Sequence, residues 1–183
     1  IREPAQAAIK GGAVGISAIN TILSVIGVDL ETLRPMPTVE GYAVPGGYSA
    51  QAVKPIALRM VSQLALSAPE EVSISGIGGI ETSHDALEFF LLGASTVQIC
   101  TGVMLQGVKM VDELKEGVEK FMADKGFNSV QEIVGKSLPY FSTHMDLVQK
   151  MKAAKRSKAG EASRDNEWAQ KDITEKTEEL TSN

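Results

Sequence analysis

Three short, mostly apolar runs recur along the chain, and each is followed by a glycine-rich or polar loop and then by a helical segment. Apolar runs of this length are typical of strands buried on both faces of a parallel sheet. Because parallel neighbours need a crossover connection, the alternation of strand and helix predicts an α/β fold. The predicted strands are residues 13–19, 71–75 and 95–100. The predicted helices are residues 3–10, 50–67, 82–92 and 107–124.

The segments between and after these units are less regular. Residues 20–48 contain prolines and glycines without a sustained period, which predicts a long irregular loop. Pro55 lies within a predicted helix and indicates a first-turn position or a kink. Residues 126–150 predict one or two further short helices, and from residue 151 the chain is charged. We therefore expect a domain at 1–150 and a tail at 151–183 that is a solvated helix or disordered.

Composition excludes several classes of function. The formal net charge is −5, so the chain lacks the basic field that nucleic-acid binding uses. No apolar run approaches the ~20 residues of a membrane-spanning helix, and we expect no membrane partner. Cys100 is the only cysteine, which forbids an intrachain disulfide and indicates a reducing compartment.

Polar residues and glycines follow each predicted strand, where α/β folds bind their ligands. Asn20 and Thr21 follow the first strand, and the Asn20 amide carries both a donor and an acceptor, as the edge of a pyrimidine or a carboxamide requires. The alternative is that Asn20 caps a turn. When Asn20 is considered without the other loops, turn capping is favoured over ligand binding.

Two loops are candidates for binding a phosphate. The first is Ile77-Gly78-Gly79, where glycine backbone N–H groups and the following helix start favour an anion, although tight turning explains glycines equally well. The second is Cys100-Thr101, after the neighbouring strand. Two adjacent loops sharing one phosphate is a recurrent arrangement in TIM barrels, and it favours a cofactor such as flavin mononucleotide (FMN).

Other reactive residues favour ordinary structural roles. Cys100 ends a predicted buried strand, so packing is favoured over a reactive thiol. His84 lies in the first turn of a predicted helix and is expected at the surface. His144 has no partner at metal-ligand spacing, and we predict no metal site.

Three segments closely resemble the flavin-binding barrel of the dihydropyrimidine dehydrogenases, within the class 1 dihydroorotate dehydrogenase superfamily. They read GGAVGISAINT, GGYSAQAVKPIALRMV and SISGIGGIETSHDALEFFLLGASTVQICTGVM. A later segment, FMADKGFNSVQEIVGKSLPYFSTHMDLV, looks most like the single-domain plant-type enzymes. The resemblance covers about residues 5–150 and implies the carboxy-terminal part, units six to eight, of a TIM (β/α)₈ barrel. A whole barrel needs about 250 residues, and the chain begins at Ile1 rather than Met, so we expect a fragment or a processed chain.

The resemblance also implies roles for individual residues. Asn20 and Thr21 match the Asn-Thr pair that hydrogen-bonds the pyrimidine substrate. The FMN contacts match the residues Ser49, Ala50, Ile77, Gly78, Gly79, Cys100 and Thr101. Ala50 replaces a glycine of the family, so a positive φ there would be costly.

The implied reaction reduces uracil and thymine to their 5,6-dihydro forms, using FMN and electrons from NADPH or NADH, directly or through a partner. The family's general-acid cysteine lies on an earlier loop and matches nothing here, so no catalytic residue is assigned in this chain and the chain alone is expected to be incomplete. We expect a homo-oligomer or association with the rest of the barrel, in the cytoplasm or, if plant-type, the plastid stroma. Dihydroorotate oxidation and an inactive barrel fragment with an interaction role remain alternatives.

Overall fold

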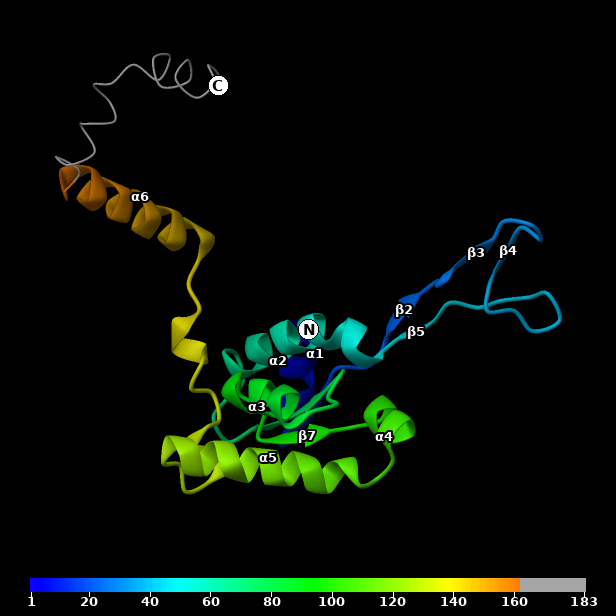
Figure 1. Ribbon diagram of the computed structural model, residues 1–183, viewed down its shortest axis with the longest axis horizontal. Coiled ribbons are helices and arrows are strands. Elements are labelled where there is room, and N and C mark those ends of the chain that lie inside the picture. The colour runs from blue at the N-terminus through cyan, green and yellow to red at the C-terminus, as the bar shows by residue number, and fades with distance from the viewer. Residues whose placement is uncertain (162–183) are drawn as a thin grey trace, which may run out of the picture. The chain divides into compact units, whose positions relative to one another are not determined.

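The computed structural model describes residues 1–161, so most of the charged tail expected at 151–183 lies outside the described residues. The chain folds into two compact units, the first at Ile1–Pro139 and the second beginning at Tyr140. The predicted boundary between residues 150 and 151 falls within the last helix, α6 (His144–Glu161), and stays a prediction. Figure 1 gives the element labels used below.

A three-stranded parallel sheet forms the centre of the first unit. Its strands are β1 (Gly15–Ala18), β6 (Ser73–Ile77) and β7 (Thr96–Gln98), in the order β1-β6-β7. The α/β class is therefore confirmed, and the helices and parallel strands form part of a (β/α) barrel whose sheet does not close.

Helices cover one face of this sheet. Helix α2 (Lys54–Ala65) contacts β1 and β6, and helix α3 (Ser83–Leu91) contacts β7. Phe89 of α3 is fully buried, and a Cβ atom on Gly76 of β6 would lie 2.5 Å from its Cδ1 atom. Helix and strand thus approach as closely as a glycine allows.

The opposite face of the sheet is polar, so the expectation of strands buried on both faces is wrong. Ser17, Ser73, Thr96 and Gln98 alternate with the covered apolar residues and are exposed. Side chains alternate between the two faces of a strand, and no described element covers this second face.

The remaining helices follow from local signals. Helix α1 (Arg2–Lys10) packs on α2. Pro55 lies in the first turn of α2, which is the first of the two positions predicted for it, a first-turn position or a kink. A short 3₁₀ helix, η1 (Ala50–Val53), precedes α2. Helix α4 (Thr101–Gln106) leads into α5 (Met110–Lys125), which packs on α3.

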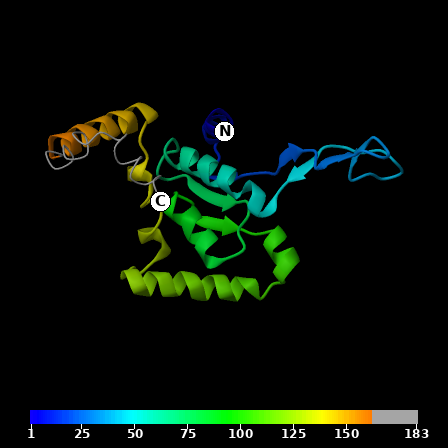
Figure 2. The same cartoon turned by 45° about the horizontal axis from the view of Figure 1, so that its top comes forward.

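The segment 20–48 is an arm of short antiparallel strands, so the expected irregular loop is wrong. Strand β2 (Ile22–Ser24) pairs with β5 (Gly46–Tyr48), and β3 (Gly27–Asp29) pairs with β4 (Arg34–Met36). The arm extends away from the sheet and helices in both views (Figures 1 and 2). Each strand has three residues, too few for an alternating pattern to be visible in the sequence.

Two 3₁₀ turns, η2 (Val130–Glu132) and η3 (Leu138–Tyr140), occupy the region where short helices were predicted. Helix α6 then starts at His144. Within residues 1–161, no helix combines the length and apolarity needed to cross a membrane.

Candidate functional site

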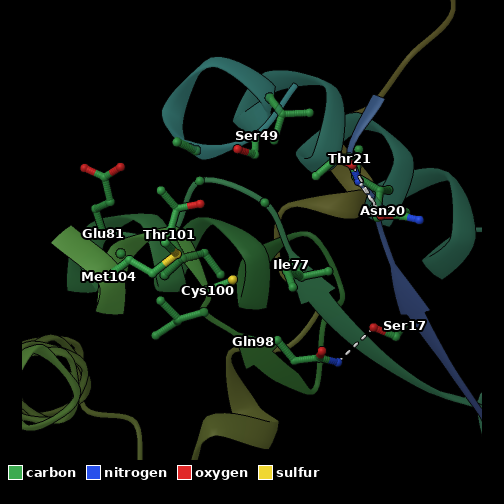
Figure 3. A pocket seen from close by; sticks show the side chains of 18 residues that line it. Ser17, Asn20, Thr21, Ser49, Ile77, Glu81, Gln98, Cys100, Thr101 and Met104 are labelled. Carbon is green, nitrogen blue, oxygen red and sulfur yellow. Dashed lines mark hydrogen bonds between the residues drawn. The ribbon is translucent and has the colours of Figure 1, made fainter. Parts of the chain in front are cut away.

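A cavity of about 590 Å³ lies at the carboxyl ends of the three parallel strands. Figure 3 shows side chains that surround it. The structure brings together all of the site residues predicted from the sequence, namely Asn20, Thr21, Ser49, Ala50, Ile77, Gly78, Gly79, Cys100 and Thr101. The volume lies within the range of small-molecule sites.

Asn20 and Thr21 form the wall that follows β1. The Asn20 Oδ1 atom accepts from the Thr21 backbone N–H at 2.8 Å, and the Thr21 hydroxyl is 3.5 Å from the same oxygen. Asn20 therefore makes a local turn contact, but its Nδ2 group donates to no described residue. Local capping and ligand binding are compatible, because they use different atoms of the amide.

The glycine loop after β6 turns sharply beneath the start of α2. Gly79 has a φ of 76°, and a Cβ atom there would lie 2.6 Å from the Ala50 carbonyl oxygen. Tight turning is thus one reason for glycine at this position. The backbone N–H groups of Gly78, Gly79 and Ile80 make no hydrogen bond to any described residue, so they remain available to an anion.

The loop after β7 lies beside the glycine loop, because β7 pairs with β6. Cys100 is the residue before α4, and Thr101 and Gly102 begin that helix, where N–H groups have no intrahelical acceptor. Cys100 is exposed and lines the cavity, so the expectation that it is packed in the core is wrong. The strand ends at Gln98, two residues earlier than predicted, which leaves Cys100 in the loop.

Ser49 and Ala50 complete the cavity from the start of η1. Ala50 has a φ of 58°, in the left-handed region that favours glycine. The family resemblance predicts strain at this position if φ is positive, and the structure confirms the positive φ. Ser49 is the N-cap residue of η1, but its side chain makes no capping hydrogen bond there.

Sequence reasoning missed a polar ladder on the uncovered face of the sheet. The Gln98 Nε2 atom donates to Ser17 Oγ and to Ser75 Oγ, both at 2.8 Å, and Figure 3 shows Gln98 reaching toward Ser17. Ser17 and Gln98 also line the cavity. In the sequence, these residues are single polar positions within apolar runs, and this alternation indicates a strand with one polar face.

The first turn of α3 is capped by side chains from its own end of the helix. Thr82 is the N-cap, and its side chain and that of Asp85 form a reciprocal capping box. The Asp85 Oδ2 atom accepts from the backbone N–H groups of Glu81 at 3.0 Å and Thr82 at 2.8 Å. The Asp85 carboxylate therefore binds the N–H groups that precede the first residue of α3, and the role of this helix start in binding an external anion stays a prediction.

Asp85 also pairs with Lys54 of α2. Burial alone would raise the pKa of Asp85, but hydrogen bonds from Lys54 and from the Glu81 and Thr82 N–H groups outweigh it and lower the pKa to about 2. Burial would lower the pKa of Lys54, but hydrogen bonds to Asp85 and Glu88 outweigh this and raise it. Both groups are therefore charged near neutral pH.

Free backbone N–H groups and hydroxyls give the cavity its capacity to bind an anion. Glu81 is the only charged residue in its described lining, so an anion would be held by the N–H groups of residues 78–80, 101 and 102. This donor set suits a phosphate group. His84, by contrast, is 81% exposed and outside the cavity, as predicted. Within residues 1–161 no three His, Cys, Asp or Glu side chains cluster as a metal site would require.

Comparisons with known proteins give the same family. The chain is 48% identical over its whole length to a chloroplastic dihydropyrimidine dehydrogenase (NADP(+)) of Arabidopsis thaliana, covering 45% of that protein. It is 50% identical over 73% of its length to the NAD-dependent dihydropyrimidine dehydrogenase subunit PreA of Escherichia coli, covering 33% of that subunit. It is also 46% identical over 75% of its length to the catalytic subunit of dihydroorotate dehydrogenase B (NAD(+)) of Pyrococcus abyssi, covering 44%.

The chain thus spans less than half the length of these relatives. A family model described as dihydroorotate dehydrogenase matches residues 1–122, which include every loop of the cavity. The chain therefore belongs to the dihydroorotate dehydrogenase family.

Proposed function

We propose that this chain supplies the FMN-phosphate and pyrimidine-binding part of a dihydropyrimidine dehydrogenase, which reduces uracil and thymine to 5,6-dihydropyrimidines. The observation that carries the proposal is the shared cavity, where two loops with free N–H groups meet the Asn20-Thr21 pair. The two dihydropyrimidine dehydrogenases are 48% and 50% identical to the chain, and the dihydroorotate dehydrogenase of Pyrococcus is 46% identical. The higher identity supports pyrimidine reduction.

The chain's residues divide into two groups by role. The N–H groups of residues 78–80 and of Thr101 would hold the FMN phosphate, with the Thr101 hydroxyl beside them. When bound, FMN supplies a hydride to the pyrimidine ring. Neither the general-acid cysteine nor the electron route is assigned in this chain. Cys100 would lie beside the phosphate, among the residues that hold it, and is not proposed as the acid.

Asn20 and Thr21 would orient the pyrimidine. Because Asn20 Oδ1 already accepts the Thr21 N–H, the Nδ2 group is free to donate to a ring carbonyl. The Thr21 hydroxyl also donates to Oδ1, at 3.5 Å, so this hydroxyl would rotate away when Oδ1 accepts a ring N–H. A planar amide that both donates and accepts matches uracil and thymine, whose carbonyl and N–H groups alternate.

We also propose NADPH or NADH as the electron source, directly or through a partner, since the relatives are named for NADP(+) and NAD. The outer strands β1 and β7 each have an unpaired edge among the described residues, which supports association with the remainder of a barrel or with another copy. The plastid stroma is the compartment to test first, because one relative is named chloroplastic. The cytoplasm is the alternative.

The test is to purify the full product of the gene that encodes this chain and measure bound flavin and substrate preference. We expect bound FMN and NAD(P)H oxidation that depends on uracil or thymine. Clear preference for dihydroorotate would replace this function with the second candidate of the same family. A flavin-free protein that turns over neither substrate would support the inactive-fragment alternative.

A further inference from the structure

A buried ion cluster lies behind the glycine loop, outside the cavity lining. Lys54 of α2 pairs with Asp85 of α3, and its Nζ atom is 2.7 Å from Glu88 Oε2. The side chains of Lys54 and Asp85 are 17% and 6% exposed. Burying charges is costly unless each finds several partners, so the cluster needs a compensating arrangement of hydrogen bonds.

Asp85 connects this cluster to the segment that follows the glycine loop. Its Oδ2 atom accepts from the Glu81 and Thr82 N–H groups and from the Thr82 hydroxyl at 2.8 Å. The end of the loop is therefore fixed to α3. The N–H groups left for a ligand are those before Glu81.

Gln51 connects the same carboxylate to the loop itself. The Gln51 Nε2 atom donates to the Gly79 carbonyl oxygen at 2.8 Å and lies 3.3 Å from Asp85 Oδ2. The C=O and N–H groups of a trans peptide point in opposite directions. Holding the Gly79 carbonyl toward Gln51 therefore also fixes the direction of the Ile80 N–H group.

We propose that Gln51, Lys54 and Asp85 form a positioning network that sets the glycine loop in its phosphate-binding conformation, and that this network makes the site select FMN over riboflavin. The proposal rests on the proposed function, because it concerns the phosphate of the same cofactor. None of the three residues lines the cavity, so the network acts through the loop. Its effect is specific to the phosphate, which riboflavin lacks.

Gln51→Leu is the mildest test, and Gln106→Leu is its matched control. Gln51 is exposed, so its loss leaves the core intact. Gln106 makes the same kind of bond, from Nε2 to the Glu81 carbonyl oxygen at 3.3 Å, but beyond the loop. In the full gene product stripped of flavin, we expect Gln51→Leu to weaken FMN binding about tenfold and riboflavin binding less than about twofold, and Gln106→Leu to change neither.

The triple variant Lys54→Met, Asp85→Asn and Glu88→Gln removes the ion cluster without leaving an unpaired buried charge. We expect it to lose the preference for FMN as well, measured by flavin fluorescence quenching alongside thermal unfolding. Equal weakening of both flavins, or a lowered unfolding temperature with the preference intact, would show a merely structural role and overturn the inference. A wild-type protein without preference for FMN would instead overturn the proposed function, and the network's role with it.

Discussion

Replacing Ala50 with glycine is expected to stabilise the chain, although it removes a methyl group. Ala50 has a φ of 58°, where a residue other than glycine pays about 1–2 kcal/mol. Glycine adds freedom to the unfolded chain, which costs about 0.4–1 kcal/mol. Subtracting this entropic cost from the relieved strain leaves a gain of about 1 kcal/mol in the free energy of unfolding. The gain arises because glycine has no Cβ atom to clash with the backbone at positive φ.

Urea unfolding of the full chain, followed by far-UV circular dichroism, measures this gain. We expect a higher midpoint with an unchanged slope, and a rise of about 2–4 °C in Tm. Ala52→Gly is the matched control, since Ala52 is exposed in the same 3₁₀ helix without a positive φ. It should lose about 0.5–1 kcal/mol. If Ala50→Gly destabilises the chain as much as Ala52→Gly, the left-handed strain is not there and the reasoning fails.

Three further predictions concern stability. Because the pKa of Asp85 is about 2 in the folded chain and 3.8 in its ordinary, unperturbed state, its contribution of about 2 kcal/mol is present above pH 3.8 and lost as pH falls toward 2. Asp85→Asn should abolish that acid dependence in pH-stepped urea titrations, and an unchanged dependence would show that another group causes it. Gly79→Ala should cost about 2 kcal/mol or more, because its φ is 76° and the new Cβ would lie 2.6 Å from the Ala50 carbonyl oxygen; wild-type stability would contradict the close approach. Gly76→Ala should cost about 1–3 kcal/mol by clashing with Phe89, and a Phe89→Leu background should reduce that cost, as a double-mutant cycle would reveal.

The elements that sequence reasoning found are those with local signals. Helix α3 has an N-cap at Thr82 and a turn at Gly93, and the parallel strands are apolar runs that end in recognisable loops. Because the ends of parallel strands meet at one edge of the sheet, strand order brought together the candidates that follow β1, β6 and β7, whereas Ser49 and Ala50 were identified only by the family resemblance. The cavity was thus predictable without any distance being known.

The elements that sequence reasoning missed depend on distant partners. Strand β2 exists because Ile22 pairs with Tyr48, and three residues carry no visible period. Lys54 and Asp85 are 31 residues apart, so no local spacing predicts their contact. The exposure of Cys100 depends on β7 ending at Gln98, and strand ends are set by pairing with β6 rather than by composition.

The ladder of Gln98, Ser75 and Ser17 has a consequence for how the strands align during folding. Strand β7 has only three paired residues, so its backbone bonds define the alignment weakly. A slip of one residue would turn Val97 to the polar face and carry Gln98 under the helices, away from both serine hydroxyls. The Gln98 side chain therefore favours the correct register of β7, the shortest strand of the parallel sheet, through hydrogen bonds that reach across both neighbouring strands.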